Sequence, residues 1–504
     1  MKTGALTTVC LALFLCGCAP VGPDYTAPNL NAPPQWTEDA KEAQPAPGLE
    51  EVAWWKALND PELDRLMHAA MAGNLDVDQA RARIRQARAE FKAAAAGSKP
   101  TVNGTGSVTR SKDSKNVSDG SGETTTLYTP GFDATWEVDV FGSVRRSVEA
   151  AEARVGAKIE DLHATQLTLL GDVANAYVQL RAAQEQLALA ERTLKAQSET
   201  AEVTRVRYQN GLTSYLDVSQ AEAETTTTAA DIPAYETTIK QSIHRLSILI
   251  GQPPDFLKQQ LGVTRSLPDC AGVAATGLPS ELLVHRPDVR EAERTLAAAS
   301  ADIGVATAEL YPKFDLTLGL GLNSDTISRL SSLSSGYWSL VPQVSALLFD
   351  GGKTKAGVDK NVAIYEEALA AYHATFLKAL EDVENALVSY ASAQTKRQTL
   401  TKSVQAYKET LMLAEEQYRK GLISFLNVLD AQRSLYTAQN NLSVTNAEVL
   451  TSFVSLNKAL GGGWKAFADA NRQTETNRDV SSLKTKGGGI TNSTPASPLA
   501  SQLS

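Results

Sequence analysis

The sequence contains few cysteines, no long apolar run and no excess of positive charge. Only four of its 504 residues are cysteines, and three of these lie near the N-terminus, so a disulfide framework cannot stabilise the rest of the chain. No run reaches the roughly 18 apolar residues that a membrane-spanning helix needs, although the alternating strands of a membrane β-barrel would give a much weaker signal. The net charge of −9 would repel a phosphate backbone, which argues against a nucleic-acid partner.

Patterns typical of catalytic sites are also missing. The five histidines show no His-Glu-x-x-His spacing, no Gly-x-Ser-x-Gly elbow occurs, and Cys270 has no CxxC partner. Residues 352–354 imitate the end of a phosphate-binding loop, but Leu347 occupies the position of the leading glycine, and the glycines at 351–352 better fit a turn from strand to helix. The sequence therefore predicts no enzyme, no metal site and no bound cofactor.

The N-terminal segment has the features of an export signal. A positively charged start is followed by an apolar stretch at 9–15 and by small residues before Cys18. The pattern over 15–18 resembles a bacterial lipobox, with Cys16 where a residue such as Ala or Ser is usual. This resemblance implies cleavage before Cys18, acylation of that cysteine with palmitate-type chains, and sorting to the outer membrane because Ala19 follows. A plain signal peptide that happens to end in cysteine is the alternative.

The chain contains a long internal duplication. Residues 142–251 match residues 352–461 without a gap, at a displacement of 210 residues. An upstream piece repeats at a displacement of 212 residues, with Pro100 matching Pro312. Each half therefore carries the same series of elements.

Each half begins with a helix and two strands. The helices are expected at about 61–98 and at about 287–310, where prolines follow them. Strand pairs are expected at about 101–140 and 313–349, because apolar residues alternate there with polar residues or glycine. This alternation predicts one face for lipid and one face for water.

A long helical hairpin ends each half, at 142–251 and at 352–461. Its first arm is 69 residues without proline, which at 1.5 Å per residue would extend roughly 100 Å. Gly211 and Gly421 are expected to end these arms as C-caps. Since four amphipathic strands cannot close a barrel, the strands must be pooled between chains, and the hairpins would continue the barrel as a tube. A rod-like coiled coil is the alternative.

The predicted organisation has six parts. They are a signal peptide at 1–17, a lipid-anchored extended segment at 18–60, the first repeat at 61–251, a linker at 252–286, the second repeat at 287–461, and an end segment with a disordered tail at 462–504.

Several motifs resemble the TolC-like outer-membrane efflux proteins, in particular their NodT-type lipoprotein branch. They are Val21-Gly22-Pro23-Asp24-Tyr25, Trp54-Trp55, Asp60-Pro61-Glu62-Leu63, Asn74-Leu75, Arg286-Pro287-Asp288-Val289-Arg290, Ala292-Glu293, Ala301-Asp302-Ile303-Gly304 and Tyr311-Pro312. The resemblance covers about 18–465. It implies a mainly α fold with membrane β: a homotrimer with a twelve-stranded outer-membrane barrel, a twelve-helix periplasmic barrel, and a belt formed by the regions around 50–75, 255–285 and 462–470.

The resemblance also implies a function. Such a trimer is the passive exit duct of a tripartite efflux pump, joined to a periplasmic adaptor and an inner-membrane pump, most simply of the RND type, and associated with multidrug resistance. A duct for protein secretion is one alternative. A non-conducting adaptor or tether is another, but an adaptor would normally carry one hairpin between β modules, and this chain has two hairpins.

Two regions are candidate sites. The first is the pair of hairpin tips, where a glycine in the turn and an apolar neighbour could receive an adaptor's helical tips; ordinary helix caps would look the same. The tip residues are Gly211, Leu212, Thr213, Gly421, Leu422 and Ser424.

The second candidate site is a periplasmic gate at Leu426 and Asp430, with Tyr418 at the start of the same tip. Leu426 and Asp430 lie one helical turn apart and so share a face, which the resemblance places toward the pore. Three copies of Asp430 would repel one another or bind cations. Some family members carry an aspartate at the place of Asn427 and an arginine at that of Ile423, and neither is present here. A solvated carboxylate on a helix surface is the alternative.

Overall fold

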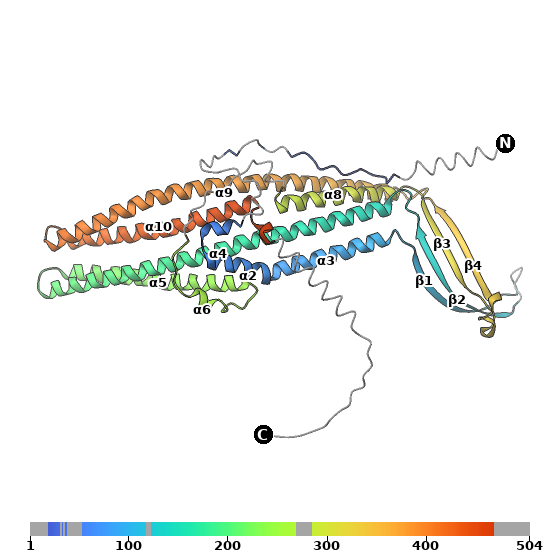
Figure 1. Ribbon diagram of the computed structural model, residues 1–504, viewed down its shortest axis with the longest axis horizontal. Helices are drawn as coiled ribbons and strands as arrows, with labels where there is room; N and C mark the ends of the chain where they lie inside the picture. Colours follow the sequence, from blue (N-terminus) through green and yellow to red (C-terminus); the bar gives the residue numbers. More distant parts are fainter. Residues whose placement is uncertain are drawn as a thin grey trace, which may run out of the picture.

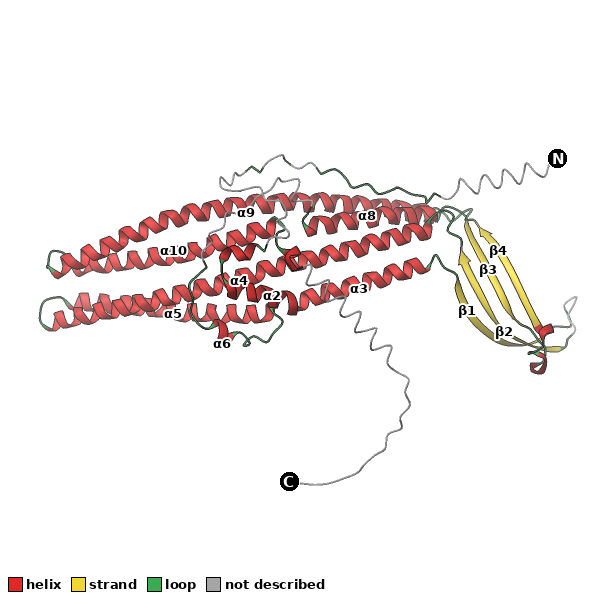
Figure 2. Cartoon of the chain, in the orientation of Figure 1, coloured by secondary structure: helices red, strands yellow, loops and turns green. Residues whose placement is uncertain are grey.

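The protein is an elongated molecule with a sheet at one end and two helical hairpins reaching the other (Figure 1). The computed structural model describes residues 19–30, 33, 36–37, 53–116, 122–268 and 285–467. Helices make up most of this part of the chain, and the strands are confined to one end (Figure 2). Within these ranges, no helix combines the length and the apolar composition of a membrane span.

Apart from α2 (Pro61–Gly73), which among the described residues occurs only in the first half, the two halves of the chain have the same order of elements. The first contains α2 (Pro61–Gly73), α3 (Leu75–Ala96), β1 (Thr101–Lys112), β2 (Thr124–Glu137), α4 (Ser143–Gln209) and α5 (Tyr215–Leu249). The second contains α8 (Pro287–Ala308), β3 (Lys313–Leu322), β4 (Gly336–Ser345), α9 (Lys353–Arg419) and α10 (Phe425–Ala459). The long arms α4 and α9 have 67 residues each, and the return helices α5 and α10 have 35 each.

The single helix expected at 61–98 is wrong, because the chain breaks at Asn74 into α2 and α3. Asn74 has the extended backbone angles φ −70° and ψ 131°. Its side-chain oxygen accepts hydrogen bonds from the backbone N–H groups of Asp76 and Val77, at 2.8 and 3.2 Å, and so caps α3. Its amide nitrogen donates to the carbonyl of Leu249 at 2.9 Å, which fixes the break against the end of α5.

The hairpin turns have the glycine geometry that the sequence predicts. Gly211 and Gly421 follow the ends of α4 and α9 with φ values of +73° and +75°, a left-handed conformation that L side chains adopt at a cost. The N–H of Leu212 donates to the carbonyl of Arg207 at the first turn. At the second turn the N–H of Leu422 donates to the carbonyl of Gln417 at 3.0 Å. Both helical arms therefore end at the predicted residues.

The sheet has the strand order β1-β2-β3-β4, and each neighbouring pair is antiparallel. The expected strand with two faces is confirmed by the register. One transverse row is apolar, and it consists of Gly104, Phe132, Leu320 and Trp338. The adjacent row is mostly polar, and it consists of Asn103, Asp133, Gly319 and Ser339. Phe132, Leu320 and Trp338 are 64%, 58% and 74% exposed, so no described part of the chain covers these side chains on the apolar face.

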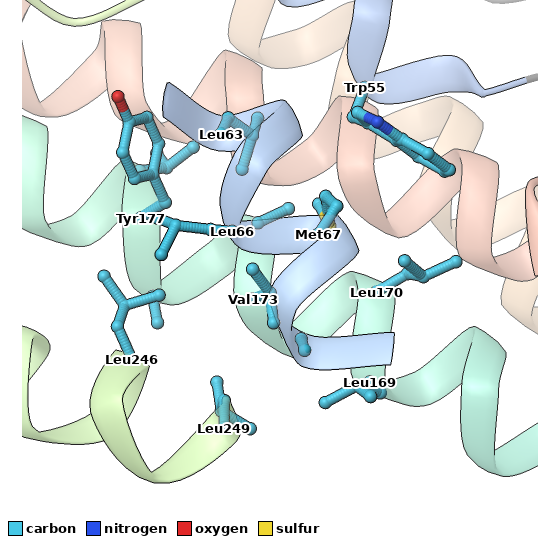
Figure 3. Packing of buried hydrophobic residues seen from close by; sticks show 14 of the residues in the cluster. Trp55, Leu63, Leu66, Met67, Leu169, Leu170, Val173, Tyr177, Leu246 and Leu249 are labelled. Carbon is cyan, nitrogen blue, oxygen red and sulfur yellow. The ribbon is translucent and has the colours of Figure 1, made fainter. Parts of the chain in front are cut away.

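The main core lies midway along the helices, where the short elements gather around α4. The 3₁₀ turn Trp54–Leu58, helix α2, the short helix α6 (Lys258–Leu261) and the 3₁₀ turn Trp464–Phe467 contribute to one apolar cluster. Figure 3 shows Trp55 and the α2 side chains packed against α4 and α5. Trp55 stacks on Phe467 with ring centroids 5.3 Å apart. This cluster joins the three regions expected to form a belt, although residues 269–284 and 468–504 lie outside the described residues.

Replacing Asn74 tests this break. Asn74→Ala removes the cap of α3 and leaves the Leu249 carbonyl without its partner, so we expect the free energy of unfolding to fall by about 1–2 kcal/mol. Thermal unfolding followed by circular dichroism checks this. Gln86→Ala, at an exposed position of α3, is the matched control and should leave the melting temperature unchanged; equal melting temperatures for the two variants would contradict the capping role.

Candidate functional site

The two hairpin tips expose an apolar side chain beside bare backbone. Leu212 is 67% exposed and Leu422 is 71% exposed. A Cβ atom added at Gly211 or Gly421 would meet no atom within 4 Å. Both tips lie at the end of the molecule opposite the sheet (Figure 1). The tips therefore have open space around the glycine, which is what contact with another protein requires.

The two tips differ in how their return helices begin. At the first tip, Ser214 and Asp217 form a capping box, and the Thr213 hydroxyl also donates to Asp217. At the second tip, the corresponding Ser424 makes no side-chain bond to the backbone of α10 and instead accepts a hydrogen bond from the Asn427 amide at 3.2 Å. Since a capping bond satisfies backbone donors at a helix start, the second tip is held less firmly than the first.

Leu426 and Asp430 share an exposed face of α10. Leu426 is 46% exposed and Asp430 is also exposed. Their neighbours Phe425, Val428 and Leu429 are buried in a small cluster between the hairpins. The two predicted gate residues therefore point away from this cluster and are not covered by the described part of the chain.

Tyr418 does not lie on that face with Leu426 and Asp430. Its ring packs against Phe425 with centroids 5.6 Å apart, and the guanidinium of Arg207 lies 4.7 Å above it. Arg207 belongs to α4, so Tyr418 lies in the interface between the two hairpins, with its hydroxyl buried. In this chain Tyr418 joins the tips and does not line the exposed face.

Polar contacts hold α10 against the first hairpin above the tips. Arg433 pairs with Glu224, and Gln432 donates to the Thr200 hydroxyl at 3.3 Å. The Tyr436 hydroxyl donates to Asp231 at 3.2 Å. Burial raises the pKa of Tyr436, and its interactions with Tyr235 and Asp231 raise it further, so the hydroxyl keeps its proton. These residues could not be predicted from the sequence, because the partners are more than 200 positions apart and no local pattern marks them.

The residues after the expected lipid site form a strap across both halves of the chain. Cys18 itself lies outside the described residues. The N–H of Val21 donates to the carbonyl of Phe141 at 3.0 Å, and Arg146 binds the Asp24 carboxylate at 2.7 Å. Gly22 lies so close to α8 that a Cβ there would be 2.4 Å from the Cα of Gly304. The strap therefore starts where the strands meet the helices (Figure 1).

The glycines that imitate a phosphate loop form the turn between β4 and α9. Gly351 and Gly352 have φ values of +68° and +92°. The carboxylate of Asp350 accepts hydrogen bonds from the N–H groups of Gly352 and Thr354 at 2.9 and 2.7 Å, and so it occupies the helix N-terminus itself. This arrangement is the predicted turn from strand to helix. In the part of the chain that the structure describes, no group of three or more metal-binding side chains is arranged around one point.

Comparison with known proteins identifies the family. The model of the family described as outer membrane efflux protein matches residues 66–252 and 278–462. The chain is similar to Nodulation protein T of Rhizobium leguminosarum bv. trifolii, with 32% identity over 93% of this chain and 100% of that protein. It is similar to the antibiotic efflux pump outer membrane protein ArpC of Pseudomonas putida, with 34% identity over 94% of this chain and 98% of that protein. The cation efflux system protein CusC of Escherichia coli is 30% identical over 92% of this chain and 100% of its own length.

Solved structures agree with these relatives. The outer-membrane channel OprN superimposes with a TM-score of 0.84 at 34% identity, over 88% of this chain and 99% of that channel. The open state of the MtrE outer membrane channel of Neisseria gonorrhoeae superimposes with a TM-score of 0.77 at 27% identity, over 89% of this chain and 99% of that channel. The family model covers both halves of the chain and the relatives match over nearly their whole length; the chain belongs to the outer membrane efflux protein family.

Proposed function

We propose that three copies of this chain form one continuous duct from the periplasm to the outside of the cell. Each copy would contribute its four strands to a twelve-stranded barrel and its four hairpin helices α4, α5, α9 and α10 to a twelve-helix tunnel. The internal two-fold repeat of the chain gives such a ring six similar units. The duct is passive, because energy for transport comes from the inner-membrane partner.

The two-faced sheet with open edges carries this proposal. Among the described residues, β1 and β4 each have a single neighbouring strand, so each presents backbone N–H and C=O groups that no other described strand pairs with. Lipid cannot satisfy such groups, and four strands are too few to close on themselves. Sharing strands between copies satisfies the edges, turns the exposed Phe132, Leu320 and Trp338 to the lipid and encloses the polar row with Asp133.

The partners follow from the position of the tips and from the names of the relatives. The tips lie at the far end from the sheet, where a periplasmic adaptor would dock, and an inner-membrane pump of the RND type would load the duct. The relatives include outer-membrane proteins of antibiotic, toluene and cation efflux systems. We therefore assign small toxic compounds as cargo, with a lipid on Cys18 anchoring the chain to the outer membrane.

The mass and conductance of the purified protein test the duct. In detergent, light scattering should give three times the chain mass of 53.8 kDa, reduced slightly by loss of the signal peptide. In planar bilayers the same material should conduct ions in discrete steps. A monomer, or an oligomer without conductance, would leave the adaptor or tether function as the better explanation.

Bulk at the hairpin turns should prevent adaptor binding. Gly211→Trp and Gly421→Trp fill the open space at each tip, and we expect recovery of the adaptor by co-purification to fall at least about tenfold, a loss of about 1.4 kcal/mol. Gly211→Ala and Gly421→Ala are the matched controls, because they add the same left-handed backbone strain of about 1–2 kcal/mol without the bulk. Unchanged drug resistance in the tryptophan variants would count against docking at the tips.

Truncation of the exposed face of α10 should open the narrow end of the duct. The double variant Leu426→Ala with Asp430→Ala removes three apolar and three charged side chains from the constriction, so single-channel conductance should rise severalfold and cation preference should fall. Asn441→Ala, an exposed position farther along α10, should change neither quantity. If the double variant conducts like the parent protein, the gate does not lie at these residues.

A further inference from the structure

The structure contains enough information to fix how one copy pairs with the next. We propose that β4 of one copy pairs with β1 of the next copy in an antiparallel register that places Gln343 opposite Ser107 and Ser345 opposite Thr105. The partner is a second copy of this chain, so the proposal rests on the duct proposed above and adds the residue-level contact.

The first step is that the two halves of the sheet share one geometry. In the first half, Thr101 of β1 pairs with Thr135 of β2. Adding 212 to the first number and 210 to the second gives Lys313 and Ser345, and these two residues pair in β3 and β4. The displacements found in the sequence on either side of the strands therefore also relate the strand registers, without a slip.

The second step applies the pairing of β2 with β3 inside one copy to the pairing of β4 with β1 of the next copy. Within the chain, β2 of the first half pairs with β3 of the second half, with Asp133 opposite Gly319 and Thr135 opposite Thr317. In a ring, β4 must pair in the same way with the β1 that follows it. Adding 210 to the β2 numbers and subtracting 212 from the β3 numbers gives Gln343 opposite Ser107 and Ser345 opposite Thr105.

The faces of the sheet agree with this register. It pairs even-numbered residues with even-numbered residues, so Val344 lies opposite Gly106 and Pro342 opposite Val108, all on the apolar side. A slip by one residue would place apolar residues opposite polar ones and turn one strand inside out, which a membrane sheet does not tolerate.

A stretch of exposed apolar residues directly after β4 also supports the register. Leu347, Leu348 and Phe349 are 54%, 95% and 89% exposed. Their counterparts in the first half are paired with a neighbouring strand: Glu137 pairs with Asp315, and the N–H of Val138 donates to the carbonyl of Phe314 at 2.8 Å. The proposed register places 347–349 opposite residues 101–103 of the next copy, so the same contact would continue the ladder and cover the apolar side chains.

The register also predicts which pairs suit a disulfide. Around β2 and β3 the hydrogen-bonded pairs have even numbers, as Tyr128 and Ser324 show by exchanging both backbone bonds. Odd-numbered pairs are then of the non-hydrogen-bonded kind, with Cα atoms about 4.5 Å apart, within the range that a disulfide spans. Gln343 and Ser107 would form such a pair. Inside one copy β1 and β4 are separated by two strands, or roughly 14 Å, so no disulfide can form within a chain.

Cysteine cross-linking in outer membranes tests the register. The test variant carries Ser107→Cys with Gln343→Cys, and the matched control carries Ser107→Cys with Val341→Cys, two residues along the same face. Both are made in a Cys270→Ser background that keeps Cys18. After mild oxidation we expect the test variant to give covalent dimers and trimers on non-reducing gels, at least about fivefold more than the control, whose Cα atoms would be roughly 8 Å apart.

Each other outcome would contradict one part of the proposal. More cross-linking in the control than in the test variant would overturn the register. No cross-linking in either variant, with a trimeric mass in detergent, would overturn the contact between β4 and β1 while leaving the oligomer. A monomeric mass for the parent protein would overturn the proposed duct itself.

Discussion

The need to satisfy backbone hydrogen bonds at the edges of the sheet governs the architecture of this protein. The edge strands β1 and β4 have one neighbouring strand each among the described residues. One face of the sheet is apolar, and its side chains are exposed. In water such a sheet would aggregate, and in lipid it would leave polar groups without partners. The proposed closure with other copies would remove both problems at once, and the hairpins, which follow the strands directly along the chain, would then line up around the same axis.

The contacts between the two halves of the chain differ along the length of the hairpins. The belt around Trp55 and Phe467 is a packed apolar core that joins both halves. Nearer the tips the hairpins are joined by a small apolar cluster and by side-chain bonds such as Arg433 with Glu224. The cluster near the tips contains far fewer buried apolar side chains than the belt, so relative motion of the hairpins costs less near the tips than at the belt.

Much of the fold could be predicted from the sequence because its signals are local. The glycines at 211 and 421, the proline-free arms and the alternating strands each depend on residues within a few positions. The break at Asn74 was missed although Gly73 and Asn74 can end one helix and cap the next, because the helical pattern continues on both sides and the position of Asn74 depends on the distant Leu249 carbonyl. Tyr418 was grouped with the gate for the same reason: its position depends on Arg207, on the other hairpin.

The strap at the N-terminal end has a consequence for how deeply the protein sits in the bilayer. Val21 is bound to the start of α4, and three residues of extended chain separate it from Cys18 by at most about 10 Å. The proposed fatty acyl group on that cysteine would therefore be joined to the folded chain by a very short segment. With that lipid in place, the length of this segment, together with the apolar band of the sheet, would set the position of the strands relative to the inner-leaflet headgroups.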